Sequence, residues 1–315
     1  MDQQIAVPAY FDDAKRDDPV WERLAAAQGV VALAVFDDWT TLTRVKPRLK
    51  VSGIKVFGLV ATHKATVELD VCQAEIDDWF RIHPDLDGIF LAEGPPLDTQ
   101  HPEILEPAWV WDYYGDNHGQ GLYHYIKRKK PGAKVFLDCA GCKDAGVFNV
   151  CDIAQVVDVD YARYKEKLWW LAASQSWWTS PPTPKTIAHV IPSCPAEEHD
   201  WSLRVAVAVS KARQAELVYV FDGEQSAYHT LPAFWQSEVV TVAANPADPC
   251  RLIDDVLSEM AAAVDDLAAA IDDTTGPEKA RLIDDLARLG EQRAEIEVVL
   301  DDCHEEWGRS RNRPA

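Results

Sequence analysis

Acidic side chains stand at the ends of several apolar segments of this sequence, where they are placed to carry out acid–base chemistry. The four that we assign as catalytic candidates are Asp37, Glu93, Asp138 and Asp158. Carboxylates held together in a concave site raise one another's pKa, which leaves a protonated acid beside an ionised partner. Cleavage of a glycosidic bond uses this pairing, and a cage for a divalent cation is the competing use of the same groups. The sequence therefore predicts a carboxylate site, although a single Asp at a strand end equally suits a helix N-cap.

Aromatic residues extend this interpretation toward carbohydrate. The chain contains 12 Trp, and several lie beside polar or Pro-rich sequence rather than in apolar runs. Indole and phenol rings combine an apolar face with a polar edge, which suits a sugar ring, and packing inside the protein is their alternative use. We predict that the partner is a polysaccharide or other glycan and that its contacts come from Tyr10, Asp12, Trp39, Trp111, Tyr161 and Asp222.

Short apolar runs rich in β-branched and aromatic residues recur along the chain and must position these side chains. Each run is apolar nearly throughout, as is typical of parallel strands covered on both faces. Eight strand–helix units in about 240 residues match a (β/α)8 TIM-type barrel, in which reacting groups lie at the carboxyl ends of the strands. A doubly wound open sheet is the alternative. The predicted strands are Ile5–Phe11, Val30–Phe36, Ile54–Ala61, Gly88–Ala92, Lys134–Asp138, Ala154–Asp158, Thr186–Ile191 and Leu217–Asp222.

The character of the sequence changes after Trp235, because Pro246, Asp248 and Pro249 interrupt the strand–helix pattern. Apolar residues then recur at heptad spacing in two segments separated by a turn at 274–277, which predicts a helical hairpin. Residues 251–307 include 17 acidic and 5 basic side chains. These form either a solvent-exposed helix face or a surface that mediates assembly. The hairpin either folds back on the barrel or pairs with another chain.

These patterns divide the chain into a barrel (1–245), an acidic helical hairpin (246–308) and a short basic tail (309–315). We predict that residues 250–307 mediate self-association or contact with an assembly partner.

Cysteine usage gives a weaker signal. Seven Cys is an odd number at low density, so we expect mostly reduced thiols rather than a disulfide framework. Cys139 and Cys142 form a lone CxxC segment, and Cys151, Cys194 and His189 would have to join it to complete a zinc site. The chain has no second CxxC pair and no Gly-rich nucleotide-binding or Ser-nucleophile motif. The sequence therefore predicts neither a metal nor another cofactor.

Net charge and hydropathy argue against two classes of partner. Lys and Arg number 31 against 52 Asp and Glu, a net charge of −21, and such a surface repels phosphate backbones and anionic lipids. No run approaches the roughly 20 apolar residues of a membrane-spanning helix. We therefore predict no nucleic-acid or membrane partner. The first residues carry no secretion signal, which predicts a chain that is cytoplasmic as synthesised and that leaves the cell, if at all, within an exported or virion-type particle.

Several soft motifs follow one another between residues 5 and 240. They are Ile5–Tyr10 with Trp21, Val56–Thr62, Asp77–Trp79, Asp87–Glu93, Val135–Leu137, Asp152–Asp158 with Tyr161, and Val218–Asp222 with Tyr228, Leu231–Pro232 and Trp235. Their order and spacing resemble the spherulin-4 family. The resemblance implies a (β/α)8 barrel related to glycoside hydrolases that cleave α-1,4-linked galactosamine polymers of microbial exopolysaccharide. It also implies a catalytic Asp at the fourth strand and a catalytic Glu at the sixth.

The sequence departs from this family at those two positions. Ala92–Glu93 stands where the family has an Asp–Glu pair, and alternation along a strand points residue 92 into the site and residue 93 elsewhere. Asp158 replaces the Glu of the sixth strand, and its shorter side chain retracts the carboxylate in chemistry that is sensitive to misplacement by about 1 Å.

Two functions follow from these departures. The favoured prediction is a barrel with a degenerate catalytic site, kept as a glycan-binding or structural component of a larger assembly. The alternative is an active glycoside hydrolase on a microbial amino-sugar polysaccharide, in which Glu93 or Asp37 partners Asp158 or Asp138.

Overall fold

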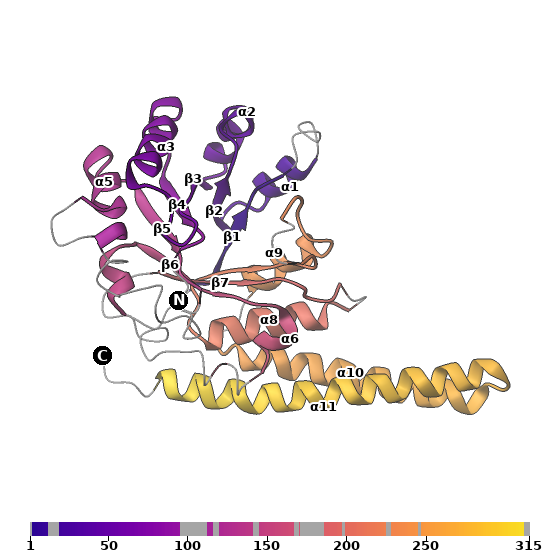
Figure 1. Cartoon of the computed structure of the whole chain (residues 1–315). Helices are drawn as coiled ribbons and strands as arrows, with labels where there is room; N and C mark the ends of the chain where they lie inside the picture. Colours follow the sequence, from indigo (N-terminus) through magenta and orange to yellow (C-terminus); the bar gives the residue numbers. More distant parts are fainter. Residues whose placement is uncertain are drawn as a thin grey trace.

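The eight predicted strands form a closed barrel in the computed structural model of this chain (Figure 1). The structure describes residues 2–11, 19–94, 112–115, 120–140, 145–166, 170, 186–196, 199–224, 228–244 and 247–311. All strands are parallel, each pairs with the next in the chain, and β8 pairs with β1, which rules out the open sheet. The strands are β1 (Gln4–Pro8), β2 (Val31–Phe36), β3 (Lys55–Ala61), β4 (Gly88–Ala92), β5 (Lys134–Asp138), β6 (Ile153–Asp158), β7 (Thr186–Ile191) and β8 (Leu217–Val220).

Helices follow the strands and cover the outside of the barrel, as Figure 1 shows. Those of the barrel are α1 (Val20–Ala26), α2 (Trp39–Val51), α3 (Leu69–Ile82), α5 (Leu122–Lys129), the 3-10 helix η2 (Ala145–Asn149), α6 (Tyr161–Tyr164), α8 (Trp201–Ala212) and α9 (Trp235–Ala244). Two longer helices, α10 (Cys250–Asp273) and α11 (Pro277–Arg311), complete the described chain.

Side chains on the strands alternate between the barrel interior and the helix layer. A large buried cluster joins the outer faces of the strands to the helices. A smaller interior cluster is made of Ala6, Leu33, Val35, Phe57, Phe90, Ala92, Phe136, Ile153, Ala188 and Leu217. Since both faces of each strand are covered, the strands read as continuous apolar runs in the sequence.

Strand β6 breaks this alternation just before it ends. Its register against β7 shifts between Gln155 and Val157. Val156 and Val157 are both buried in the outer cluster, whereas Gln155 and Asp158 line the cavity inside the barrel. An irregularity of this kind re-aims the side chains that follow it. Strict alternation from Gln155 would have turned Val157 inward instead of Asp158.

Two of the acidic residues that follow strands act as helix N-caps. The Asp38 carboxylate accepts hydrogen bonds from the backbone N–H groups of Thr40 (3.0 Å) and Thr41 (2.7 Å) at the start of α2. The Asp160 carboxylate accepts one from Arg163 (2.9 Å) at the start of α6. For these two residues, the capping role considered in the sequence analysis is confirmed.

The predicted helical hairpin is formed by α10 and α11, which pack against each other and against α8 (Figure 1). Ile253, Val256 and Met260 of α10 are fully buried. Helix α8 is apolar nearly all round, and ten of its twelve residues are buried. Such a helix needs cover on every side. Of the two arrangements considered for the hairpin, the structure has the one that folds back on the barrel.

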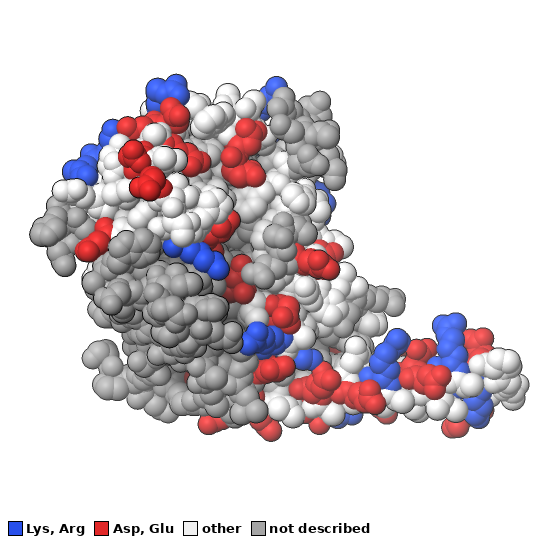
Figure 2. Space-filling view, in the orientation of Figure 1, with Lys and Arg blue, Asp and Glu red and all other residues white. Residues whose placement is uncertain are grey.

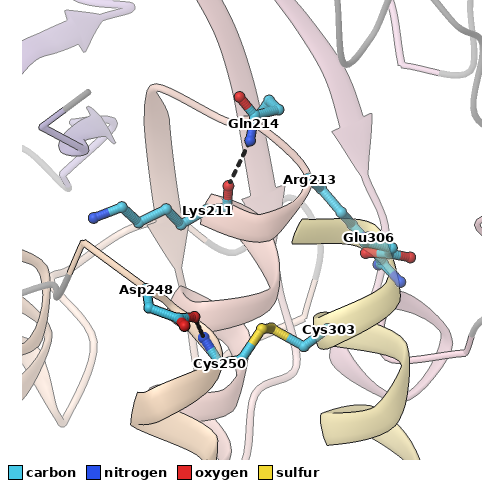
Figure 3. Close-up of a disulfide and its surroundings, with 7 residues drawn as sticks. All are labelled: Lys211, Arg213, Gln214, Asp248, Cys250, Cys303 and Glu306. Carbon is cyan, nitrogen blue, oxygen red and sulfur yellow. Dashed lines mark hydrogen bonds and ion pairs between the residues drawn. A yellow bond between two sulfur atoms is a disulfide. The ribbon is translucent and has the colours of Figure 1, made fainter. Parts of the chain in front are cut away.

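A disulfide closes the root of the hairpin, where α10 begins and α11 approaches its end (Figure 3). Cys250 and Cys303 are bonded across 53 residues of sequence, and both are buried. The sequence analysis did not predict this pairing, because it expected mostly reduced thiols. The other described cysteines, Cys72, Cys139, Cys151 and Cys194, are buried and not part of a disulfide.

A buried ion pair lies beside the disulfide, between Arg213 after α8 and Glu306 of α11 (Figure 3). Arg213 Nε and Glu306 Oε2 are 3.2 Å apart, and the side chains are 2% and 8% exposed. The Arg213 guanidinium also donates to the Tyr164 carbonyl and lies 4.8 Å and 4.4 Å from the ring centroids of Tyr164 and Trp170. The hairpin root is therefore joined to the barrel by a charge pair, a cation–π cluster and apolar packing.

The far half of the hairpin extends away from the barrel (Figure 1). Its apolar side chains are only half covered, and Ile283 is 48% exposed. Acidic and basic side chains are mixed along this projecting part (Figure 2). One ion pair of α11 joins Arg288 to Asp285 at 2.8 Å. Within the described chain, no helix combines the length and the apolar character needed to cross a bilayer.

Candidate functional site

A cavity of about 460 Å³ opens at the carboxyl ends of the barrel strands. Its polar lining comes from six elements: Tyr10 follows β1, Glu93 follows β4, Asp138 ends β5, Gln155 and Asp158 lie on β6, His189 lies on β7, and Tyr228 follows β8. The floor is apolar and includes Val35, Leu59, Phe90, Ala92 and Phe136. Among the described residues that line it, none is Lys or Arg. This is the end of the barrel where enzymes of this architecture carry their reacting groups.

Asp138 is the acidic group most strongly perturbed by the cavity. Burial, followed by the negative charge of Asp158, raises the pKa of its carboxyl to about 7. Hydrogen bonds from the backbone N–H groups of Ala140 (3.3 Å) and Glu93 act against this shift but do not cancel it. Asp138 is therefore protonated in a large fraction of molecules at neutral pH, as a general acid requires.

Asp158 is the second carboxylate of the cavity. The shifted register of β6 brings it inside the barrel, and its charge raises the pKa of Asp138, Tyr10 and Tyr228. Two carboxyl groups that act on each other in this way share their protons as a pair. The structure thus brings together Asp138 and Asp158 from among the four catalytic candidates.

Tyr10 and Tyr228 cover the pair from the β1 and β8 sides. Their rings meet edge to face, with centroids 6.3 Å apart. Burial, followed by nearby carboxylates, raises the pKa of both phenols well above its ordinary value. Both hydroxyls therefore remain protonated over the working pH range and can donate hydrogen bonds into the cavity.

Glu93 also lines the cavity, and its backbone N–H donates to Asp138, but its carboxylate is 55% exposed and turns toward His63. Its backbone φ is +50°, in the left-handed region, and its carboxylate lies 2.6 Å from Nδ1 of His63. Thr62 fixes this turn by donating its N–H (3.0 Å) and its hydroxyl (2.9 Å) to the Ala92 carbonyl. The Ala92 side chain faces the barrel interior, as alternation along β4 predicts. Strand β4 accordingly places no carboxylate in the centre of the cavity.

The other sequence-predicted residues that the structure describes are not part of the cavity lining. Asp37 is exposed after β2, although its negative charge contributes to the raised pKa of the Tyr10 phenol. Trp39 begins α2 and meets Trp79 edge to face at 5.9 Å. Tyr161 is buried in the helix layer, and the Asp222 carboxylate accepts the N–H of Ala233 at 3.1 Å. Asp12 and Trp111 lie outside the described residues.

Three polar residues of the cavity lining were not assigned to the site from the sequence: Gln155, Tyr228 and His189. Gln155 had a usable signal, because it is the one polar side chain inside the apolar run of β6. Tyr228 had none, since only folding of the β8 loop brings it to the cavity. His189 belongs to the lining through β7, but its Nδ1 is 2.8 Å from the Tyr164 hydroxyl, and burial followed by the Arg213 charge lowers its pKa to about 3.

The cysteines of the weak zinc hypothesis do not gather in the part of the chain that the structure describes. There, no group of three or more His, Cys, Asp or Glu side chains is arranged to hold a metal ion. Cys142 of the CxxC segment lies outside the described residues.

Comparisons with known proteins agree with this architecture. Residues 34–242, about two thirds of the chain, match the family model of spherulation-specific family 4. The structure of Sph3 from Aspergillus clavatus in complex with GalNAc superposes with a TM-score of 0.54 at 19% sequence identity, covering 77% of this chain and 98% of Sph3. The glycoside hydrolase domain of PelA from Pseudomonas aeruginosa aligns with a TM-score of 0.41 at 11% identity, covering 73% and 96%. No curated protein matches the chain.

Proposed function

Because this chain belongs to spherulation-specific family 4 and has a glycoside-hydrolase-like barrel, we propose that it binds a glycan in the barrel cavity and hydrolyses it with Asp138 and Asp158. The observation that carries this proposal is the raised pKa of a half-buried Asp138 next to a second carboxylate in the same cavity. Two carboxyl groups with different protonation states are the minimal machinery for glycosidic cleavage. This choice develops the alternative of the sequence analysis, with Asp138 rather than Glu93 or Asp37 as the partner of Asp158.

In the proposed reaction, protonated Asp138 donates its proton to the glycosidic oxygen as the bond from that oxygen to the anomeric carbon breaks. Ionised Asp158 stabilises the positive charge that develops on the sugar ring and receives the proton of the attacking water. The apolar floor excludes bulk water, which strengthens these charge interactions. The pair then returns to its starting state when Asp158 loses that proton and Asp138 regains one.

The acidic lining favours an amino sugar as the substrate class. With Asp138, Asp158 and Glu93 in the lining and no described Lys or Arg among them, the cavity attracts a cationic ammonium group. The sugar complex of Sph3 supports a hexosamine in particular. We therefore propose a microbial amino-sugar polysaccharide as the substrate.

A glycan-binding role without hydrolysis is the second candidate. The observation in its favour is Ala92, which leaves β4 without a carboxylate facing the barrel interior. In this case the projecting half of the hairpin, with its exposed Ile283, would attach the barrel to a larger assembly or to a second copy.

The deciding experiment measures new reducing ends released from a panel of microbial polysaccharides, including an α-1,4-galactosamine polymer in deacetylated and fully N-acetylated forms. We expect release by the wild type to fall at least about 100-fold in Asp138→Asn and in Asp158→Asn. Asp160→Asn is the matched control, because it lies two residues from Asp158 and Asn caps a helix as well as Asp does. Retained binding with no release from any polymer would establish the non-catalytic role instead.

The Cys250–Cys303 disulfide bears on where the protein works. Cytosolic thiols are kept reduced, so a buried structural disulfide supports a site of action in an oxidising compartment or outside the cell. We therefore propose that the chain is exported after synthesis. Mass spectrometry of the native protein after thiol alkylation tests this: intact Cys250–Cys303 is expected, and alkylation of both residues would contradict it.

A further inference from the structure

Tyr228 is held at the cavity by aromatic packing. It is 7% exposed, and its ring lies 5.3 Å from that of Phe221 and 6.1 Å from that of Tyr219. Its hydroxyl is buried without a hydrogen bond of ordinary geometry to a described residue, and a hydrogen-bonding interaction with the Asp158 carboxylate is among the causes that raise its pKa. A buried phenol costs free energy unless it donates its proton, so a tyrosine kept in this state at a cavity requires a partner in the working molecule.

The candidate partners are the two carboxylates of the cavity. After burial, the charge of Asp158 is the largest influence on the Tyr228 phenol, followed by that of Asp138. For the Tyr10 phenol the order is different: the charges of Asp37 and Asp138 raise its pKa more than the charge of Asp158 does. Of the two carboxylates of the pair, Asp158 therefore acts more strongly on Tyr228, and Asp138 acts more strongly on Tyr10.

The loop after β8 is braced so that Tyr228 stays in this position. Asp222 at the start of the loop accepts a hydrogen bond from the Ala233 N–H at its end, over 3.1 Å. Phe221 and Tyr219, which pack on the Tyr228 ring, are themselves buried and stacked on each other. Asp222, predicted from the sequence as a substrate contact, is placed to fix this loop.

We propose that Tyr228 is a positioning residue that donates its phenolic proton to the Asp158 carboxylate and so assigns the proton shared by the pair to Asp138. A hydrogen bond to a carboxylate favours its ionised form. With Asp158 held ionised, its negative charge keeps Asp138 protonated. Tyr228 therefore sets which group is the acid and which is the base. This inference rests on the proposed function, since the roles of the pair matter only if it performs catalysis.

Other ionisable groups that face the pair must be considered in any pH dependence. They are Glu93 at the rim, Asp37 near Tyr10, and Tyr10 itself. None of them is changed by a substitution at Tyr228, so a comparison at that position isolates the Tyr228 hydroxyl.

The test compares wild type, Tyr228→Phe and Tyr219→Phe. Tyr219 is the matched control, because its hydroxyl is also buried without a described partner and its ring belongs to the same cluster, but it does not line the cavity. We measure kcat/KM against pH on the best polysaccharide substrate. In Tyr228→Phe the apparent pKa of the acidic limb is expected to increase by about one unit and that of the basic limb to decrease by about one unit. The pH profile therefore becomes narrower. Tyr219→Phe is expected to keep both limbs of the wild type.

A second readout does not depend on hydrolysis. The carboxyl carbons of Asp138 and Asp158 are followed by 13C NMR during a pH titration of each protein, and thermal melting verifies that all three are folded. A higher pKa for Asp158 and a lower one for Asp138 in Tyr228→Phe support the inference even if no polymer is cleaved, in which case the proposed function alone fails. Unchanged limbs and unchanged titrations in Tyr228→Phe would overturn it.

Discussion

The barrel cavity and the root of the hairpin both bury charged side chains, but they balance them in opposite ways. At the hairpin root, the Arg213 guanidinium meets the Glu306 carboxylate at 3.2 Å and lies over two aromatic rings. In the cavity, Asp138 and Asp158 face each other with no described Lys or Arg in the lining, and the pKa of Asp138 rises to about 7.

The difference separates charge used for structure from charge used for chemistry. A buried ion pair that is compensated locks two elements together and does not titrate near neutral pH. A buried acid without a compensating cation lowers stability and gains a proton that it can transfer. Substitutions in the two regions should therefore act in opposite directions on stability.

The largest expected effect is at the hairpin root. Glu306→Ala leaves Arg213 buried without a counter-charge, and we expect the free energy of unfolding to fall by about 3–5 kcal/mol. Urea denaturation measures this change. Glu259→Ala is the control: its partner Arg204 is at 2.6 Å, but Glu259 is 51% exposed, so its loss should matter far less. Equal effects of the two substitutions would contradict the structural role of burial.

The disulfide is expected to contribute the next largest effect. It closes a segment of 53 residues, and replacing Cys250 and Cys303 together by Ser should lower the free energy of unfolding by about 2–4 kcal/mol. The same measurement with added dithiothreitol provides the control, because the reductant should destabilise the wild type and leave the double variant unchanged. A wild type indifferent to reductant under denaturing conditions would refute the contribution.

Asp138→Asn should do the opposite and stabilise the protein above pH 7. The pKa of Asp138 is raised from 3.8 to about 7 on folding, so the folded chain retains a proton that the unfolded chain releases between about pH 4 and 7. Stability that depends on this group is present below pH 4 and is lost as the pH rises to 7. At pH 8 we expect Asp138→Asn to be more stable by about 1–3 kcal/mol, with the difference vanishing near pH 4. An Asp138→Asn variant that is less stable than the wild type at pH 8 would contradict this prediction.

The smallest effect is expected at the exposed end of the hairpin. Arg288 and Asp285 are 2.8 Å apart, but their side chains are 72% and 32% exposed, and surface pairs of this kind are worth roughly 0–1 kcal/mol. Arg288→Ala should leave the thermal midpoint within about 1–2 °C of the wild type. A loss comparable to that of Glu306→Ala would show that the far half of the hairpin is not a solvated face.

The sequence predicted the scaffold well because periodicity reports burial directly. The eight apolar runs, the closed parallel barrel and the two hairpin helices all follow from it, and so does the inward placement of Ala92. Acidic residues at strand ends were also correctly expected to gather at one end of the barrel.

What escaped prediction depends on single breaks in regularity or on distant contacts. The irregularity in β6 that turns Asp158 inward leaves no trace in an otherwise uniform apolar run. Cys250 meets Cys303 only because α10 and α11 run antiparallel, and Tyr228 enters the site only through the fold of its loop.

The central claim, that Asp138 and Asp158 form an uncompensated pair with a shared proton, is tested most directly by 13C NMR titration of the Asp138 carboxyl in wild type and in Asp158→Asn. The account predicts a pKa near 7 for Asp138 in the wild type and a lower value in Asp158→Asn, where burial and the Glu93 charge still raise it. A wild-type pKa near 4, or one that Asp158→Asn leaves unchanged, would contradict it.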